Sequence, residues 1–438
     1  MWLKDLIYKW FFKKPTDPED FLKKQQVWAR EYFGDNGYNV RKIASITLSN
    51  IVIGDSTLTI SGDTPRSEWL SEQVVGFWDK KLPKALSDAL GVGGVYVVPY
   101  IANGKVCTDV VPQSQVIVSR RIDDLPVDIS ILNEIRTVDD RKYARVTNHY
   151  IEDGKYVVKV KCVDDSGRQL PLATVPEWGM LTEEFSIAGM GSHAVDRLPI
   201  AYLSSPRTGQ TMTGEPITAG LDGLIDQIGQ VFEDFFTEYK NKKAFIGASD
   251  LLFDADNKLP KSGLFKKLSA AGAADGETLW EVFDPAIRDA SYTAGLDYLF
   301  SKLETGIGVS GGIFTKLSTH GATATEIKSA NYNTYMLLHD CRSKIKAAIE
   351  TLCYGLSLWA DAPQLAPDGA HEIGFDWDYS LFESSSETWA QLRDAKASGA
   401  VSTVELRQYI KPEESIEQAE QAVDQIKANE PTLSQLGF

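Results

Sequence analysis

The sequence has 438 residues, with 45 Lys and Arg against 61 Asp and Glu, so its formal net charge is −16 at pH 7. Hydrophobic residues make up 43% and charged residues 24%, which is typical of globular proteins and excludes a fibrous protein or a chain disordered throughout. At roughly 150 residues per domain, the length allows about two or three domains. The acidity argues against a DNA binder with an ordinary basic surface, although not against a protein that surrounds DNA without gripping it.

The cysteines and the first residues indicate where such a chain would be found. Cys107, Cys162, Cys341 and Cys353 form no C-x-x-C pair and are too few for a disulfide scaffold, so we expect a reducing compartment. Residues 1–14 place aromatic and aliphatic side chains on one helical face, but charges interrupt them and no cleavage site follows. We expect a short docked helix rather than a signal peptide, with a membrane-surface anchor as the alternative. No segment is long and apolar enough to span a membrane.

The first half of the chain is predicted to be mixed. We expect a helix at 16–33, strands within the β-branched segment 41–62 and a helix at 67–90. A hairpin with its turn at Asn103-Gly104 follows. Residues 127–204 are mostly β, with turns at 153–154 and 166–167.

The second half is predicted to be mainly helical. We expect a helix at 217–240, a mixed insert at 244–285 and a helix at 287–305. A loop rich in Gly, Ser and Thr, residues 306–322, separates these from a very long helix at 323–360. A short strand within 372–380 precedes helices at about 384–398, 402–409 and 412–428. The fold class is therefore α+β, with a helical half interrupted by a small insert.

Motifs for catalysis are weak or absent. The G-x-G-x-x-G pattern at 306–311 follows a helical run, whereas a dinucleotide site must follow a strand. There is no P-loop motif, and the five histidines are scattered without zinc-site spacing. The sequence Asp254, Asp256, Asn257 resembles part of a calcium loop but lacks its glycine and distal glutamate. We therefore expect no enzyme, no catalytic residue, no cofactor and no metal.

The helix at 217–240 carries an apolar stripe and a second stripe that is acidic. The acidic stripe is either a solvated face or a functional surface, and it contains Asp222, Asp226, Glu233 and Glu238. The long helix at 323–360 would extend roughly 57 Å. A helix of that length needs lateral partners, either other helices of its own chain or further copies of the chain.

Three segments resemble the portal proteins of tailed bacteriophages, specifically the type common in phages of Gram-positive bacteria. They are residues 91–118, with a glycine-rich turn into paired strands, residues 198–246, and residues 281–345. The last is the most specific, since it contains Asp284-Pro285-x-x-Arg288, then Gly308-Val309-Ser310 with Phe314, then Thr323-Ala324-Thr325-Glu326 at the start of the long helix. The resemblance covers roughly residues 16–380.

The resemblance implies a ring, usually of twelve identical subunits, at one capsid vertex, through which double-stranded DNA is packaged and ejected. It implies a wing, a two-helix stem, a clip, a tunnel loop and a crown in each subunit. Transferred to this chain, the wing is 1–215, the first stem helix 216–242, the clip 243–286, the second stem helix 287–305 and the tunnel loop 306–322. The long helix and its return to the wing are 323–383, and the helical crown region is 384–438.

The resemblance also implies roles for particular residues. The acidic stripe would face the channel or a neighbouring subunit, and repulsion of the phosphate backbone would let DNA slide. The side chains of the tunnel loop that face DNA would be Ile313, Phe314, Thr315, Lys316, Leu317, Ser318, Thr319 and His320. Its hinges would be Gly306, Gly308, Gly311, Gly312 and Gly321. The clip would bind partners through Phe253, Lys258, Lys261, Phe265, Lys266, Lys267 and Trp280.

The implied partners are copies of the chain itself, DNA bound without sequence specificity, the terminase large subunit, the head–tail adaptor, and the major capsid and scaffolding proteins. The implied location is the virion, and the host cytoplasm during assembly, with no membrane. Two other classes stay open: a capsid or tail ring that conducts no DNA, and a soluble enzyme with an acidic pocket.

Overall fold

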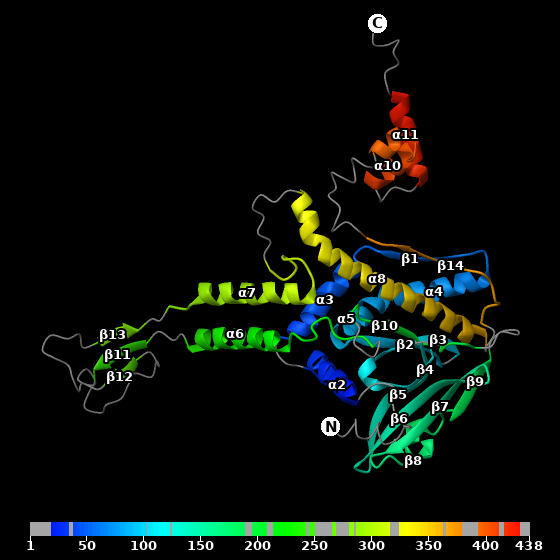
Figure 1. Cartoon of the computed structure of the whole chain (residues 1–438), viewed down its shortest axis with the longest axis horizontal. Coiled ribbons are helices and arrows are strands. Elements are labelled where there is room, and N and C mark those ends of the chain that lie inside the picture. The colour runs from blue at the N-terminus through cyan, green and yellow to red at the C-terminus, as the bar shows by residue number, and fades with distance from the viewer. Residues whose placement is uncertain are drawn as a thin grey trace, which may run out of the picture. The chain divides into compact units, whose positions relative to one another are not determined.

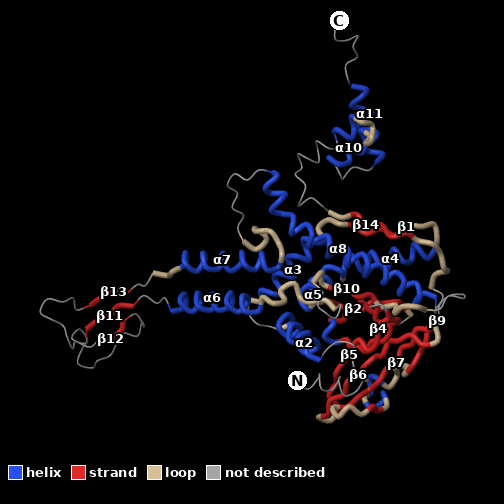
Figure 2. The backbone as a smooth tube through the Cα atoms, in the orientation of Figure 1, coloured by secondary structure: helices blue, strands red, loops and turns tan. Residues whose placement is uncertain are grey.

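The computed structural model describes most of the chain. The described residues are 19–34, 38–102, 104–122, 125–188, 195–207, 213–241, 245–249, 265–268, 280–283, 286–315, 324–361, 365–378, 393–410 and 416–429. The chain forms two compact units, one of residues 1–320 and 332–376 and the other of 321–331 and 377–438. The first unit mixes helices with sheets and so agrees with the predicted α+β class (Figure 1, Figure 2).

The first unit begins with helices α2 (Glu19–Phe33) and α3 (Val40–Ile53). The prediction of strands within 41–62 is correct only for β1 (Thr57–Ser61) and wrong for Val40–Ile53, which is helical. In α3, residues four apart face the core, among them Ala44, Leu48 and Val52. The Asn39 side chain caps this helix by accepting a hydrogen bond from the Lys42 amide at 3.0 Å. Burial of one helical face and a good cap outweigh the β propensity of Ile, Val and Thr.

The predicted single helix at 67–90 is two helices, α4 (Pro65–Lys80) and α5 (Leu82–Val92). Pro83 explains the break, because it has no amide hydrogen to continue the ladder and its ring clashes with the preceding turn. α5 is buried along most of its length. It ends at Gly93, where φ is +100° and a Cβ would lie 2.2 Å from the Gly214 carbonyl oxygen, so only glycine fits.

Two sheets build the β-rich part of the unit. The first has the order β10-β2-β3, from β2 (Gly94–Ala102), β3 (Lys105–Pro112) and β10 (Ala201–Ser204). The second has the order β4-β5-β6-β7-β8, with β9 also on β7. Its bounds are β4 (Val116–Ile122), β5 (Leu125–Val138), β6 (Arg141–Glu152), β7 (Lys155–Asp164), β8 (Gln169–Leu170) and β9 (Glu184–Ala188). Short 3-10 turns lie at Gln113–Gln115, Leu172–Thr174 and Pro176–Trp178.

The turns of these strands follow the predictions. The β2–β3 hairpin turns between Ala102 and Lys105, with positive φ at Gly104, and β6–β7 turns at Asp153 and Gly154, both with positive φ. The second sheet buries Ile117, Ala144 and Val146 in one cluster, and Tyr143, Cys162 and Trp178 in another.

Helix α8 (Ala324–Asp361) matches the predicted long helix, and its residues from Tyr332 onward belong to the first unit. It buries Ile345, Leu352 and Trp359. After α8, strand β14 (Glu372–Asp376) pairs with β1 in a two-stranded antiparallel sheet, so the chain comes back to the N-terminal part of the first unit. This return lies alongside α4 (Figure 1).

Three short strands lie between helices α6 (Asp222–Asn241) and α7 (Asp289–Ile307) in the sequence. These are β11 (Phe245–Ser249), β12 (Phe265–Leu268) and β13 (Trp280–Phe283), in the order β12-β11-β13. The predicted helix–insert–helix order is confirmed, with the insert shown to contain a small sheet.

The second unit contains α10 (Thr403–Ile410) and α11 (Ile416–Asn429), which contact each other and bury Leu406, Ala419 and Val423. The α10 N-terminus has a reciprocal cap, since Ser402 Oγ accepts from the Glu405 amide and Glu405 accepts from the Ser402 amide. None of the described helices is both long enough and apolar enough to cross a membrane.

Candidate functional site

The α6–α7 hairpin is the part of the first unit on which the sequence predictions converge (Figure 1). The two helices pack antiparallel: the start of α6 lies beside the end of α7, and the end of α6 lies beside the start of α7. Leu221 lies against Gly306 near one end, Phe232 against Phe300 in the middle, and Phe235 against Tyr292 toward the other end. Gly306 is therefore a helical residue that permits close packing rather than a loop hinge, since a Cβ there would lie 2.7 Å from Leu221.

An ion pair holds the end of the hairpin next to the small sheet. Glu238 accepts hydrogen bonds from Arg288 Nη2 at 2.6 Å and from the Tyr292 hydroxyl at 2.8 Å. These bonds lower the pKa of Glu238 to about 2, and the hydrogen bond from the Arg288 side chain contributes most. Glu238 was predicted to share the acidic stripe, but it lies about 160° around the helix from Asp222 and points to α7. It ties α6 to α7 and is not part of the acidic stripe.

The lowered pKa of Glu238 predicts a pH dependence of stability. Since the folded-state pKa is below the ordinary value, the stabilisation is complete above about pH 4.5, declines as pH falls and vanishes near pH 2. The melting temperatures of the wild type and Glu238→Gln should therefore differ by a constant amount at neutral pH and converge only near pH 2. Thermal melts from pH 7 downward test this, with Asp234→Asn as the control. Convergence already at pH 4.5 would contradict the tie.

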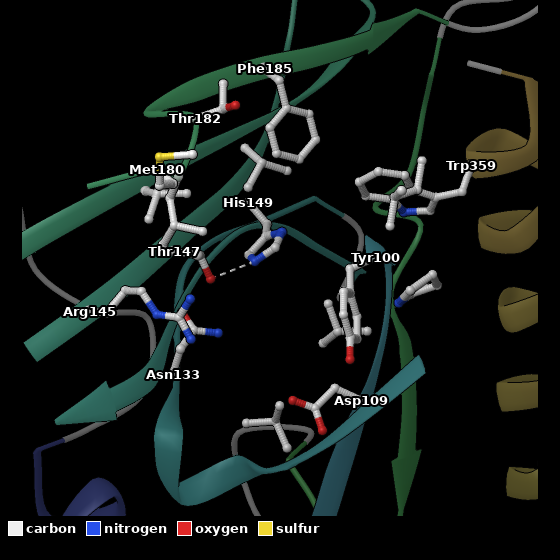
Figure 3. A pocket seen from close by; sticks show the side chains of 17 residues that line it. Tyr100, Asp109, Asn133, Arg145, Thr147, His149, Met180, Thr182, Phe185 and Trp359 are labelled. Atoms are coloured by element: carbon white, nitrogen blue, oxygen red, sulfur yellow. Dashed lines mark hydrogen bonds between the residues drawn. The ribbon is translucent and has the colours of Figure 1, made fainter. Parts of the chain in front are cut away.

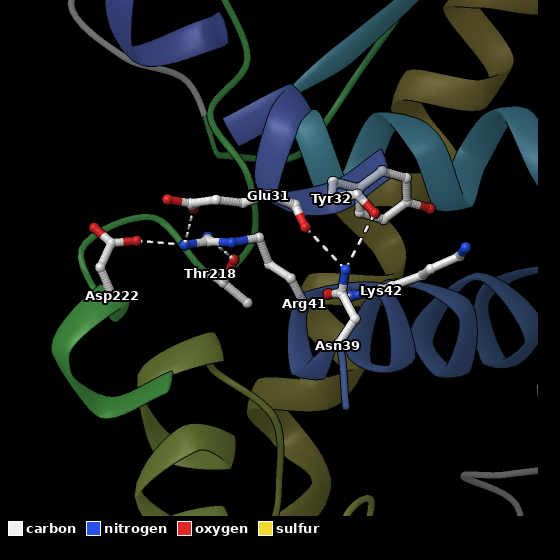
Figure 4. A network of polar contacts seen from close by, with 7 residues as sticks. All are labelled: Glu31, Tyr32, Asn39, Arg41, Lys42, Thr218 and Asp222. Carbon is white, nitrogen blue, oxygen red and sulfur yellow. Dashed lines mark hydrogen bonds and ion pairs between the residues drawn. The ribbon is translucent and has the colours of Figure 1, made fainter. Parts of the chain in front are cut away.

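A buried arginine holds the opposite end of α6 (Figure 4). The Arg41 side chain is buried, and it bonds Thr218 Oγ1 at 2.6 Å, Asp222 Oδ1 at 2.5 Å and Glu31 Oε2 at 2.9 Å. It thereby joins α2, α3 and the first residue of α6. Asp222 is thus engaged by a cation, although it was predicted in the acidic stripe.

A second arginine joins the two helices at the same end. Arg207 donates to the Ala219 carbonyl oxygen, before α6, at 3.1 Å, and to the Gly306 carbonyl oxygen near the end of α7. Arg41 and Arg207 together fix where the hairpin leaves the rest of the unit.

The remaining stripe consists of two exposed carboxylates. Asp226 and Glu233 lie within about 40° of Asp222 around the helix axis. Among the described residues, neither has an ion-pair partner. Asp226 and Glu233 therefore form an exposed acidic face of α6 within the described part of the chain.

The segment after α7 is a fixed turn as far as Thr315. The Glu304 side chain is only 1% exposed and lies under this turn. Its Oε1 accepts from the backbone amides of Gly312 at 3.0 Å, Phe314 at 2.6 Å and Thr315 at 3.1 Å. A buried carboxylate surrounded by convergent backbone donors is strongly held.

The same turn is also fixed to α8. The Ser310 amide donates to Thr334 Oγ1 at 2.7 Å, and the Thr334 hydroxyl donates to Ser310 Oγ at 2.8 Å. Gly308 and Gly312 adopt φ of +90° and +100°, which the turn requires. Between 308 and 315, the glycines therefore build an anchored turn; the prediction of freely moving hinges at Gly308, Gly311 and Gly312 does not agree with these contacts.

Several predicted residues lie outside the described part of the chain. They are Lys316, Leu317, Ser318, Thr319, His320 and Gly321 of the loop, and Phe253, Lys258 and Lys261 of the insert. Phe265, Lys266 and Lys267 lie in β12, and Trp280 lies in β13. Ile313, Phe314 and Thr315 are half-buried in the anchored turn.

Sequence reasoning missed Glu304, Arg41 and Arg207. Arg41 and Arg207 act across large sequence separations, which no local pattern marks. Glu304 acts through the way the next residues fold back over it. Its one signal in the sequence was an acidic residue in the last turn of a predicted helix, where the helix dipole disfavours it. Within the described residues, no group of three His, Cys, Asp or Glu side chains is arranged to hold a metal ion.

Comparisons with known proteins add structural similarity only. No protein-family model matches the sequence, and no curated protein does. A chain from the virion of a native gene transfer agent particle matches at 13% identity over 91% of this chain and 95% of its own, with a TM-score of 0.48. A chain from the neck of the native particle, computed with C12 symmetry, matches at 12% identity over 89% and 93%, with a TM-score of 0.44.

The neck of the empty particle, computed with C6 symmetry, contains a chain at 13% identity over 91% and 95%, with a TM-score of 0.45. These structural neighbours are chains of gene transfer agent particles.

Proposed function

We propose that the chain is a portal protein, whose copies close into a ring at one capsid vertex and conduct double-stranded DNA through an axial channel. The observation that carries this proposal is the α6–α7 hairpin: a small sheet closes one end, two arginines fix the other, and α7 continues through the Glu304-anchored turn toward α8. In this proposal, these parts form the stem, the clip and the base of the tunnel loop.

Exposed aromatic side chains support assembly into a ring. Phe236, Tyr239, Tyr298 and Tyr332 lie exposed on α6, α7 and α8. Exposed aromatic side chains are well suited to contacts between copies, and identical head-to-tail contacts between copies close a ring. Sedimentation and negative-stain images of the purified chain test this: rings with a central hole are expected, and 48 kDa monomers at micromolar concentration in several salts would contradict it.

The acidic face of α6 would line the channel or meet a neighbouring subunit. Around a ring, Asp226 and Glu233 would form bands of negative charge that repel the phosphate backbone and keep DNA centred. The alternative is that this face of α6 points outward into solvent.

Reversing these two charges distinguishes a face that lines the channel from a face that points into solvent. In a channel, Asp226→Lys with Glu233→Lys should raise the affinity of the ring for duplex DNA at low salt by roughly tenfold or more and slow DNA passage. The control is Glu72→Lys with Asp79→Lys, a pair with the same seven-residue spacing exposed on α4. DNA filter binding measures the difference. Equal affinities in both variants would put the stripe away from the channel.

The segment 308–322 would form the tunnel loop and the narrowest part of the channel. The turn at 308–315 gives it a fixed base, and the residues that follow supply Lys316, Ser318, Thr319 and His320 for transient contact with phosphates. One lysine per subunit is a weak grip, which suits sliding rather than binding.

The insert between α6 and α7 would be the clip, which binds the terminase large subunit first and the head–tail adaptor later. Lys266 and Lys267 on β12 supply adjacent positive charges in an acidic chain. Lys266→Glu with Lys267→Glu should leave the ring intact and impair terminase-dependent packaging, as an in vitro packaging assay would measure. Lys346→Glu on α8 is the control, and normal packaging by the double variant would refute this role.

The remaining assignments follow from the same proposal. The helices of the second unit would form the crown, and the β-rich part of the first unit the wing. Capsid and scaffolding proteins would surround that wing during assembly in the host cytoplasm, and the finished ring would stay in the virion.

A further inference from the structure

One side of the α6–α7 hairpin carries a group of aromatic rings that is partly exposed. Tyr38, from the segment between α2 and α3, packs on Phe232 of α6 with their ring centroids 4.4 Å apart. Phe232 in turn contacts Phe300 of α7 at 6.5 Å. Tyr38 is 49% exposed, and Phe236, one turn after Phe232, is 53% exposed. We call Tyr38, Phe232, Phe236 and Phe300 the aromatic patch, and such exposed aromatic groups are typical of the centre of protein–protein interfaces.

The opposite side of the hairpin carries an exposed ring next to a positive charge. Tyr298 is 62% exposed, and the Nζ atom of Lys302 lies 5.2 Å from its ring centroid. Tyr298 precedes Phe300 of the aromatic patch by two residues, which is about 160° around α7, so the two rings point to opposite sides. Within the described part of the chain, no carboxylate forms an ion pair with Lys302.

On the side of the aromatic patch, the charge is negative. Glu31 and Asp222 share one guanidinium, that of Arg41, at 2.9 and 2.5 Å (Figure 4). Arg41 is buried, whereas the side chains of Glu31 and Asp222 are 37% and 58% exposed. Asp222 lies about 40° from Phe236 around the axis of α6, so it is on the patch side. Two carboxylates against one cation leave a negative charge that a second cation from outside would neutralise.

The two sides also match in height along the hairpin. Leu221 lies against Gly306, and heights can be counted from this contact at about 1.5 Å per residue. Lys302 is then at about 6 Å and Asp222 at about 1.5 Å, whereas Tyr298 is at about 12 Å and the α6 ring at the centre of the aromatic patch at about 16.5 Å. Each pair differs by about 4.5 Å, which a lysine or tyrosine side chain can span. Copies in a ring whose axis follows the hairpin lie at equal height, so the two sides would meet in register.

We propose that Tyr298 of one copy packs on the aromatic patch of the next copy in the ring, and that Lys302 of the first copy pairs with Glu31 and Asp222 of the second. This contact rests on the proposed function, and it names the two hairpin surfaces that hold neighbouring subunits together. It does not involve the exposed acidic face of α6, so that face remains available to the channel.

A cleft in the β-rich part of the first unit is the competing acceptor for Tyr298 (Figure 3). It has a volume of about 490 Å³, and it combines apolar side chains with the carboxylate of Asp109, which could meet Lys302. Met180 lines it and is 95% exposed. Its described lining includes no residue of α6 or α7, so a contact between hairpins leaves the cleft unoccupied and makes Met180 a control position.

Site-directed cross-linking tests the contact. Two differently tagged chains, both with Cys107→Ser, are co-assembled, one with Tyr298→Cys and the other with Tyr38→Cys. A short bismaleimide should give mixed dimers at least tenfold above those from Tyr298→Cys with Met180→Cys. The matched control is Asp297→Cys, an exposed position one residue before Tyr298 on a different side of α7, which should cross-link to Tyr38→Cys severalfold less.

A charge reversal tests the ion pair in chains that keep their native cysteines. Lys302→Glu should raise the protein concentration at half-assembly by about tenfold or more, because it puts a third carboxylate beside Glu31 and Asp222. Lys105→Glu makes the same change of charge at an exposed position of β3 and should shift that concentration by less than about twofold. Sedimentation velocity measures both, and equal shifts would refute the ion pair.

The outcomes separate this contact from the proposed function. Rings without an excess of mixed dimers at Tyr38→Cys would overturn the contact and leave the portal proposal intact, and so would preferential cross-linking to Met180→Cys. Mixed dimers without closed rings would support the contact and count against the portal. The absence of both would refute both, including the case in which a different protein covers the aromatic patch.

Discussion

Replacing Glu304 with alanine is expected to lower the free energy of unfolding by about 3 kcal/mol. The change removes the acceptor for three backbone amides and leaves them partly buried, and each lost bond of this kind costs about 1–3 kcal/mol. Urea denaturation measures the loss. Protease cleavage within 310–320 should rise at the same time, because the turn loses its anchor.

Two variants control this experiment. Glu304→Gln keeps one acceptor oxygen and should lose less stability than the alanine variant. Asp297→Ala removes an exposed carboxylate from the same helix and should change stability by less than about 0.5 kcal/mol. If Glu304→Ala were as stable as Asp297→Ala, the turn would not depend on the carboxylate.

Replacing Arg66 with methionine is expected to lower the free energy of unfolding by about 3–5 kcal/mol, the usual cost of removing one partner from a buried ion pair. Arg66 is 1% exposed and contacts Asp361 Oδ1 at 2.5 Å. It also donates to the carbonyl oxygens of Ser357 at 2.7 Å and Ala366 at 2.6 Å. It thus joins α4 to the end of α8.

Arg66→Lys distinguishes geometry from charge. A single ammonium cannot satisfy the carboxylate and both carbonyls at once, so most of the loss should remain. Urea titrations of the three proteins give the comparison. A loss under 1 kcal/mol in the methionine variant would mean that α8 is held by its apolar contacts alone.

Strong periodic signals made much of this fold predictable. Helices α6, α7 and α8 have apolar stripes long enough to dominate local propensity. The turns at Gly104 and Gly154 need positive φ, which glycine marks in the sequence. The β-branched segment of α3 misled, because tertiary burial of one helical face decided its conformation.

The site was predictable only where one helix defines it. Helical geometry alone puts Asp226 and Glu233 on one face, and the same geometry would have separated Glu238 from them. The hydrogen bonds of Glu304 could not be predicted from the sequence, because they depend on how a turn folds back over α7. The arginine contacts of Arg41 and Arg207 join residues far apart in the sequence, which no local pattern encodes.

The most direct test of the portal proposal is a cryo-electron microscopy reconstruction of the assembled chain. We expect a closed ring in which α6 and α7 surround an axial channel wide enough for duplex DNA, and the segment after Glu304 projects toward the axis at its narrowest point. A ring with this segment on the outer rim and α6 facing away from the axis would contradict it, as would a chain that forms no ring.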